Sequence, residues 1–243
     1  MSSRHKKIIL RPDRVIDTIA TLRNRIHERF GEPGLFRVCG QLLEIARIDG
    51  QRASSLGRGY FGMRLLLAVV LAAGGAALWQ VAPVFLSAGP ARDITSLLLG
   101  IESAVQLVLL TGAAILFLVN LEERLKRRRA LDALHELRSI VHVIDMHQLT
   151  KDPSKFIVGT NTPSSPPFEL NEFQMTRYLD YCSEMLSLAS KVAVLFGQVL
   201  KDPAVAEAVS DIEHVSAGLS QKIWQKIMIL QQMREKQAEG KAG

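Results

Sequence analysis

The sequence predicts an all-α integral membrane protein, in which a two-helix transmembrane hairpin carries a cytoplasmic helical bundle. Three observations lead to this fold class. Two long stretches, residues 65–91 and 103–121, contain no charged side chain. Apolar residues recur at helical spacing through much of the remaining chain. No run alternates apolar and polar residues over the length of a strand, so β-structure is not expected.

Residues 1–60 are expected to form a cytoplasmic N-terminal helical region. An amphipathic helix is predicted to begin at Pro12, and a second one over residues 35–48 follows a Gly/Pro break at 31–34. The first apolar run starts only at Leu65, too late for a secretory signal peptide. The apolar stripe of the first helix consists of Val15, Ile16, Ile19, Leu22, Ile26 and Phe30.

Two segments have the length and composition of transmembrane helices. About 20 apolar residues in helical form cross the bilayer core. Residues 65–85 and 101–121 meet this requirement, and residues 86–100 form the short external loop between them. A buried hairpin of a soluble domain is the alternative, but helices of soluble domains rarely stay free of charge for so long.

The distribution of lysine and arginine predicts the orientation of the hairpin. Residues 1–64 carry 13 Lys/Arg against 6 Asp/Glu, and Arg64 stands directly before the first span. The connecting loop has only Arg92, which is next to Asp93. Positive flanks stay on the cytoplasmic side. We therefore expect a multi-pass protein of the inner (cytoplasmic) membrane with both termini in the cytoplasm. The basic residues after the second span are Arg124, Lys126, Arg127, Arg128 and Arg129.

Small residues form one face of the first span. Such faces allow two helices to approach closely inside a membrane, where apolar side chains alone give little drive for association. The expected partner is the second span, which contains Gly112. A contact between two copies of the chain is the alternative. The small residues at helical spacing include Ala68, Ala72 and Gly75.

Two polar residues near the start of the second span suggest a different function. Glu102 and Gln106 share a helical face. Glu102 is about 28 Å of helix from Leu121, which places it at the outer headgroup edge. We interpret it as an interfacial acid, because charge inside the bilayer is costly and rare. A pore-lining role is the alternative.

Residues 122–243 are expected to form a cytoplasmic three-helix region. A helix over residues 122–148 continues from the second span, and a Pro/Ser-rich loop follows at about 151–170. The next helix, about 171–200, has a broad apolar seam that suits a bundle better than a two-stranded coiled coil. Pro203 is well placed to start the last helix.

One polar cluster is a candidate metal site. Zinc normally requires three or four protein ligands. His142 and Asp145 supply two, and Arg138 beside them disfavours a cation. We therefore predict no metal site, with these two residues as weak candidates. The cluster on this helix flank consists of His135, Arg138, His142 and Asp145.

No motif predicts catalysis or a cofactor. The sequence lacks the Gly-x-Ser-x-Gly, Walker and Gly-x-Gly-x-x-Gly patterns. Cys39 and Cys182 stand far apart without a second ligand nearby, which favours two reduced, buried thiols. Residues 122–243 carry 16 basic and 16 acidic residues, so no concentrated basic face for nucleic acid is expected.

These patterns favour a membrane-anchored helical interaction or scaffold module without catalytic activity. Broad apolar seams on long helices suggest self-association, so the expected partners are the lipid bilayer, a second copy of the chain and a cytosolic protein. The first alternative is a subunit of a transport or channel assembly that uses Glu102 and Gln106. The second is a metal-dependent enzyme that uses His142 and Asp145.

Overall fold

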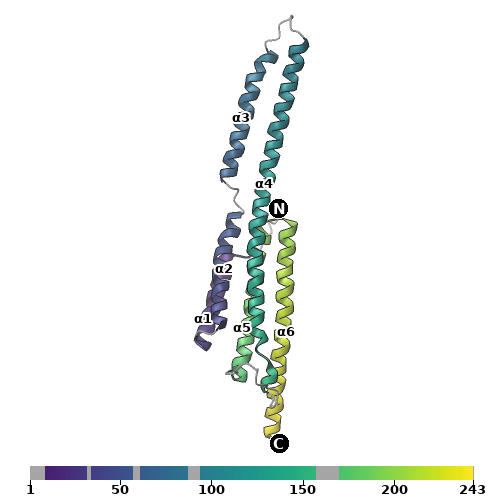
Figure 1. Cartoon of the computed structure of the whole chain (residues 1–243). Helices are drawn as coiled ribbons and strands as arrows, with labels where there is room; N and C mark the ends of the chain where they lie inside the picture. Colours follow the sequence, from purple (N-terminus) through teal and green to yellow (C-terminus); the bar gives the residue numbers. More distant parts are fainter. Residues whose placement is uncertain (1–8, 32–33, 57–60, 87–93, 157–169, 243) are drawn as a thin grey trace, which may run out of the picture. The chain divides into compact units, whose positions relative to one another are not determined.

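The structure is a computed structural model that describes residues 9–31, 34–56, 61–86, 94–156 and 170–242 (Figure 1). All the elements of this described part are helices, which confirms the all-α class. The chain divides into two compact units. We call residues 1–57 together with 129–243 the bundle unit, and residues 58–128 the apolar unit.

The two predicted N-terminal helices are present. Helix α1 (Pro12–Phe30) has Pro12 in its first turn, where the missing N–H costs nothing. It buries Val15, Ile19, Leu22 and Ile26, all members of the predicted stripe. It ends at Gly31, whose positive φ of 74° suits a residue without a Cβ. Helix α2 (Gly34–Leu56) continues eight residues beyond the expected end at Ile48.

Helix α4 (Ile94–Leu149) is longer than either segment predicted for it. It is continuous over 56 residues, because no proline interrupts it. It therefore joins the expected span 101–121 to the helix expected at 122–148. It begins inside the range expected for the external loop, 86–100. The remaining loop residues, 87–93, lie outside the described residues, as do residues 157–169 of the Pro/Ser-rich loop.

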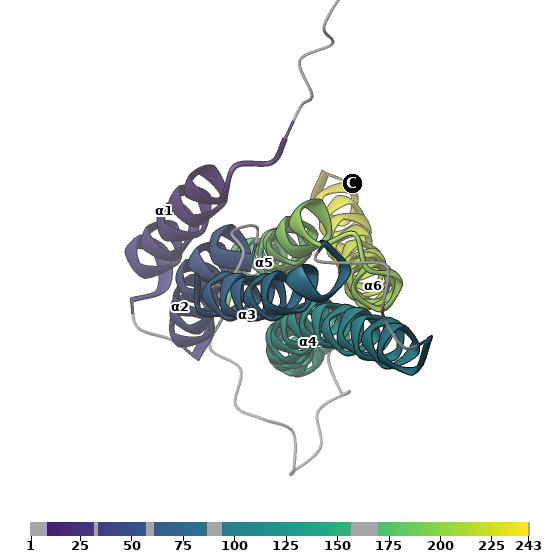
Figure 2. The ribbon, with the colours of Figure 1, turned by 90° about the horizontal axis from the view of Figure 1, so that it is seen from above.

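Two further long helices complete the bundle unit. After the short 3₁₀ helix η1 (Pro153–Phe156), α5 (Glu172–Val199) starts at a capping box in which Asn171 and Gln174 satisfy each other's backbone N–H groups. Helix α6 (Pro203–Ala242) begins at the predicted proline. Figure 2 shows α5 between α1 and α2 on one side and α6 on the other.

The bundle unit has one hydrophobic core, to which helices from both ends of the sequence contribute. Leu22 of α1, Leu42 of α2 and Leu137 of α4 are buried in it together with Phe196 of α5 and Ile223 of α6. The C-terminal helices could in principle be completed by the N-terminal ones or by a second copy of the chain. The N-terminal helices complete them.

The chain leaves the bundle unit twice at the same end. Gly34 lies against the His147 ring, whereas Arg52 approaches Glu136 at 3.8 Å, so α2 runs antiparallel to α4. The last residues of α2 and the first bundle residues of α4 are therefore neighbours. We call this the exit end and the opposite one the far end. The stretch of α4 from Ala130 to Gln148 is about 27 Å long at 1.5 Å per residue.

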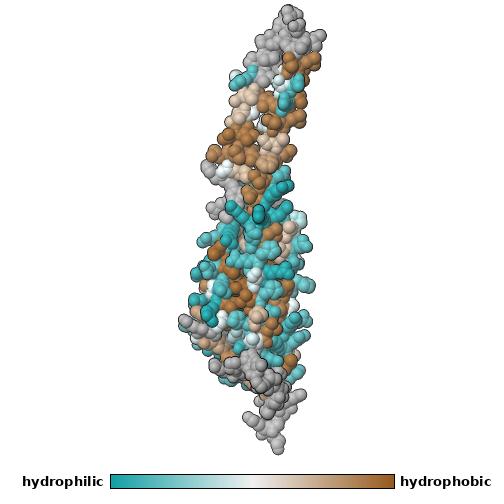
Figure 3. Space-filling view, viewed as in Figure 1, coloured by the Kyte–Doolittle hydropathy of each residue, from teal (hydrophilic) through white to brown (hydrophobic). Residues whose placement is uncertain are grey.

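The apolar unit consists of α3 (Phe61–Leu86) and the first part of α4. Large apolar side chains such as Trp79 (81% exposed), Leu98 and Leu110 lie on its surface, which is mostly hydrophobic in Figure 3. Both helices are long and apolar enough to cross a membrane. Exposed apolar surface on this scale is uncommon on proteins surrounded by water.

Candidate interaction site

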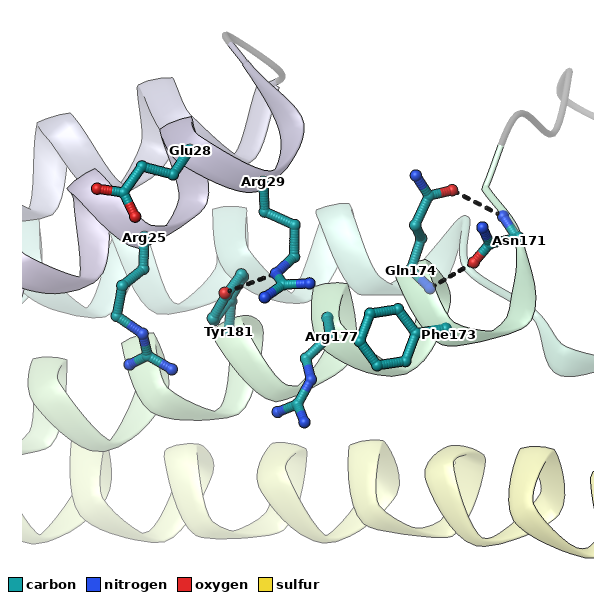
Figure 4. A pocket seen from close by; sticks show the side chains of 8 residues that line it. All are labelled: Arg25, Glu28, Arg29, Asn171, Phe173, Gln174, Arg177 and Tyr181. Carbon is teal, nitrogen blue, oxygen red and sulfur yellow. Dashed lines mark hydrogen bonds between the residues drawn. The ribbon is translucent and has the colours of Figure 1, made fainter.

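A groove at the far end of the bundle unit is the most promising site in the described chain (Figure 4). It encloses about 570 Å³ between the second half of α1 and the first turns of α5. This volume falls in the range of ligand-binding clefts. We call it the arginine groove. It is lined by Arg25, Glu28, Arg29, Asn171, Phe173, Gln174, Arg177 and Tyr181.

Helices α1 and α5 form the two walls of the groove. On α1, Ile26 is buried, and Arg25 and Arg29 flank it at a spacing of four residues, which places them on one side of the helix. On α5, the capping box fixes the first turn: the Asn171 side chain accepts from the Gln174 N–H at 2.8 Å. The Gln174 side chain accepts from the Asn171 N–H at 2.9 Å.

Arg29 is held in place by two aromatic residues of α5. Its Nε donates to the Tyr181 hydroxyl at 3.2 Å, and its guanidinium lies over the Phe173 ring, 5.5 Å from the centroid. Tyr181 is itself buried and packs edge-on against Phe30. These contacts leave the two terminal nitrogens of Arg29 without a carboxylate partner among the described residues.

The other two arginines of the groove are paired with acids. Arg25 donates to both oxygens of Glu184, at 2.7 and 3.2 Å, and this hydrogen-bonded pair raises the pKa of Arg25 above its ordinary value. Arg177 donates to Asp180 at 3.2 Å. Arg177 also lies 5.6 Å from the Phe173 centroid, so this ring, 54% exposed, has a guanidinium against it from each helix.

A second hollow of about 630 Å³ adjoins the arginine groove. The two hollows share Asn171, Phe173 and Arg177. The second one extends to α6 through Gln231 and Arg234 and is also lined by Glu172 and Thr176. Together they form a trough that crosses from α1 over the start of α5 to α6. The arginine side chains around the exposed Phe173 ring could bind a ligand that has both acceptor groups and an apolar part.

No protein-family model, curated protein or solved structure matches the chain. Its function is therefore inferred from its own geometry.

The candidate metal residues lie on α4, away from the groove. His142 is exposed, and Asp145 accepts from the Gln148 side chain at 2.6 Å. Within the described part of the chain, no group of three or more His, Cys, Asp or Glu residues is placed to hold a metal ion. His135 is exposed as well, and Arg138 approaches Asp211 of α6 at 3.9 Å. The cluster is thus spread over a solvent-facing helix flank.

The two cysteines lie in the core of the bundle unit. Cys39 and Cys182 are both fully buried and neither forms a disulfide. Burial raises the pKa of each thiol to about 12. The reactive thiolate is therefore scarce at neutral pH. This fits the prediction of two reduced, buried thiols.

The structure places a different glycine between the two apolar helices. Ala68, Ala72 and Gly75 are exposed, and no atom lies within 4 Å of a Cβ built on Gly75. The glycine at the contact is Gly74, where a Cβ would lie 3.0 Å from the side chain of Thr111. Gly112, expected to face the small residues, has open space around its Cβ position.

Several other polar residues of the apolar unit are exposed. Glu102 and Gln106 are exposed on α4, and Arg64 is exposed on α3. Lys126 forms an ion pair with Glu122 at 2.6 Å. Arg127 and Arg128, the next basic residues, are exposed, and so is Arg129 at the start of the bundle part of α4.

Sequence reasoning missed the arginine groove. The Asn171/Gln174 capping box and the spacing of Arg25 and Arg29 are visible in the sequence, but each describes only one wall. The residues that meet across the groove, such as Arg29 and Tyr181, are 152 positions apart. No local pattern brings them together.

Proposed function

We propose that the chain is a membrane-anchored helical interaction module without catalytic activity. The shared core of the bundle unit carries this proposal. Helices from before residue 57 and after residue 129 pack into one body, so both lie on the same side of any membrane that the apolar unit enters. The chain between them then crosses an even number of times, and two apolar helices make one hairpin.

The basic flanks support a cytoplasmic position for the bundle unit. Arg64 stands before the first span, and Lys126 begins a run of four basic residues after the second. Such flanks remain on the cytoplasmic side of the inner membrane. The hairpin then serves as the anchor. The bundle unit presents the arginine groove to a cytosolic protein.

Labelling of introduced cysteines tests the anchor. In a background without the native cysteines, Ser96→Cys near the start of α4 and Ser139→Cys in the bundle unit are compared in spheroplasts. A membrane-impermeant maleimide is expected to label position 96 in intact spheroplasts, and position 139 only after permeabilisation. Labelling of position 139 in intact spheroplasts, or extraction of the protein by alkaline carbonate, would contradict the proposed anchor.

Self-association belongs to the same proposal. The exposed small-residue face of α3, with Ala68, Ala72 and Gly75, leaves room for a close helix contact with a second copy. Thr111 already occupies the space beside Gly74. The two neighbouring glycines therefore have different roles: Gly74 joins α3 to α4 within one chain, and Gly75 joins two chains.

Leucine substitutions at the two glycines separate these roles. Gly74→Leu is expected to push α3 and α4 apart, which lengthens the distance between spin labels at the exposed positions 78 and 108. Gly75→Leu is expected to leave that distance unchanged and to convert a homo-oligomer into a monomer in native mass spectrometry. A wild-type monomer would contradict self-association. Equal effects of both substitutions on the label distance would contradict the contact at Gly74.

A further inference from the structure

The trough at the far end contains two guanidinium groups that form no ion pair with an acid of the described chain. Arg25 and Arg177 are paired with Glu184 and Asp180. Arg29 and Arg234 form no ion pair with a carboxylate among the described residues. Arg29 lines the first hollow and Arg234 the second, and Phe173 lines both. Two acids also line the trough, Glu28 and Glu172. Figure 4 shows Glu28 turned away from Arg29 and Phe173.

Arg29 is pre-organised to bind a carboxylate. The hydrogen bond from its Nε to Tyr181 and its packing over Phe173 fix the plane of the guanidinium before a ligand arrives. A guanidinium held in this way offers its remaining N–H groups as a fork that matches the two oxygens of a carboxylate or phosphate. Less side-chain entropy is lost on binding when the donor is already ordered.

The shape of the trough favours an extended ligand over a single ion. The two hollows of about 570 and 630 Å³ share Asn171, Phe173 and Arg177, so a ligand can run from α1 to α6 without leaving the surface. The exposed Phe173 ring at their junction offers an apolar contact between the unpaired guanidiniums. A peptide with acidic side chains and an apolar residue between them matches this order.

The trough lies at the far end of the bundle unit. Tyr178 contacts His147 near the end of α4, and Tyr181 lines the groove one helical turn away. The groove is therefore at the far end, separated from the exit end by about 27 Å of helix.

We infer that the trough formed by the arginine groove and the adjoining hollow binds an extended acidic segment of a cytosolic protein. Arg29 takes one carboxylate, Phe173 the apolar residue and Arg234 a second carboxylate. This inference rests on the proposed function for its partner, since only a cytoplasmic bundle unit meets a cytosolic protein. Its binding test is independent of the membrane anchor, because the peptide reaches the trough in detergent solution.

Fluorescence anisotropy with the full-length protein in neutral detergent tests the inference. The probe is a labelled ten-residue peptide of alternating glutamate and serine with one central leucine, and its lysine counterpart is the negative control. Arg29→Gln is expected to weaken binding at least about tenfold, since hydrogen bonds between charged groups are the strong ones. Arg14→Gln removes the same charge from the exposed start of α1 and is expected to change binding less than about twofold. Glu28→Gln is expected to tighten binding.

Three results would overturn the inference. The first is equal weakening by Arg14→Gln and Arg29→Gln, which indicates non-specific attraction. The second is displacement of the probe by inorganic phosphate at the concentration of unlabelled peptide that displaces it, which indicates a single-anion site. The third is no binding of the acidic probe by wild-type protein, or equal binding of the lysine peptide. If the cysteine labelling still gives the expected topology, the anchor proposal stands and only the acidic ligand fails.

Discussion

Leu22→Ala is expected to destabilise the entire bundle unit by about 2–5 kcal/mol, the usual cost of truncating a fully buried leucine. Leu22 is on α1 and is 1% exposed in the core shared with α5. Because the core is common to both ends of the chain, the loss is expected to open α5 as well. The buried thiol of Cys182 on α5 reports this opening, and its labelling by a maleimide is expected to accelerate at least about thirtyfold.

Asn24→Ala is the matched control, because Asn24 is an exposed residue of the same helix. It is expected to change the labelling rate of Cys182 by less than about twofold, as surface substitutions usually do. Destabilisation by Leu22→Ala without faster labelling of Cys182 would show that α1 unfolds independently. That result would contradict the single core, and with it the argument that both ends of the chain lie on one side of a membrane.

Asp49→Asn is expected to stabilise the protein at neutral pH. Asp49 is 1% exposed, and its Oδ2 has no hydrogen-bond partner among the described residues. Its Oδ1 accepts from Arg52 at 3.2 Å. Burial is the main cause that raises the pKa of Asp49 to about 6, with Glu136 also raising it and Arg52 opposing the shift.

The sign of the pH dependence follows from proton linkage. The folded protein holds the proton of Asp49 more tightly than the unfolded chain, whose carboxyl has a pKa near 3.8. The contribution of this proton to the free energy of unfolding is therefore fully present below about pH 4. It is lost as the pH rises through about 6. The loss amounts to about 3 kcal/mol for a shift of this size. The amide that replaces the carboxyl stays neutral at every pH, so the variant is expected to lose this part of the pH dependence.

Chemical denaturation between pH 4.5 and 7.5 measures the effect. At pH 7.5, Asp49→Asn is expected to raise the free energy of unfolding by on the order of 1–3 kcal/mol. At pH 4.5 the gain is expected to be about a third as large. Asp132→Asn, at an exposed position of α4, is the control and is expected to leave the curve unchanged. A lower stability of Asp49→Asn at pH 7.5 would mean that the ion pair with Arg52 outweighs the cost of burial.

The sequence predicted the elements whose faces differ in polarity. The stripe of α1 was correct because charged residues occupy its other side, and the seam of α5 was correct for the same reason. The face of α3 that packs on α4 is harder to predict, because this helix is apolar all around. Gly74 and Gly75 are 100° apart on a helix, and in such a segment no polar residue marks which of them faces Thr111.

The long-range contacts were beyond sequence reasoning for a different reason. Helical periodicity shows that a face is buried, and it does not name the helix that covers it. The seam of α5 is broad enough for several neighbours, and α1, α2 and α6 all pack against it. Once Ile26 and Tyr181 have their places in the core, Arg29 and Phe173 meet at its edge. The candidate site is thus a consequence of tertiary packing.

The shared core also sets an order of events during synthesis. Arg25 leaves the ribosome long before its partner Glu184, which is 159 residues further along the chain. At translation rates of about 5–20 residues per second, the delay is roughly 8–30 s. During this interval the apolar faces of α1 and α2 can pair with each other and with the later part of α4, but not yet with α5. The packing of the N-terminal helices is therefore completed only after the apolar unit and α5 have been made.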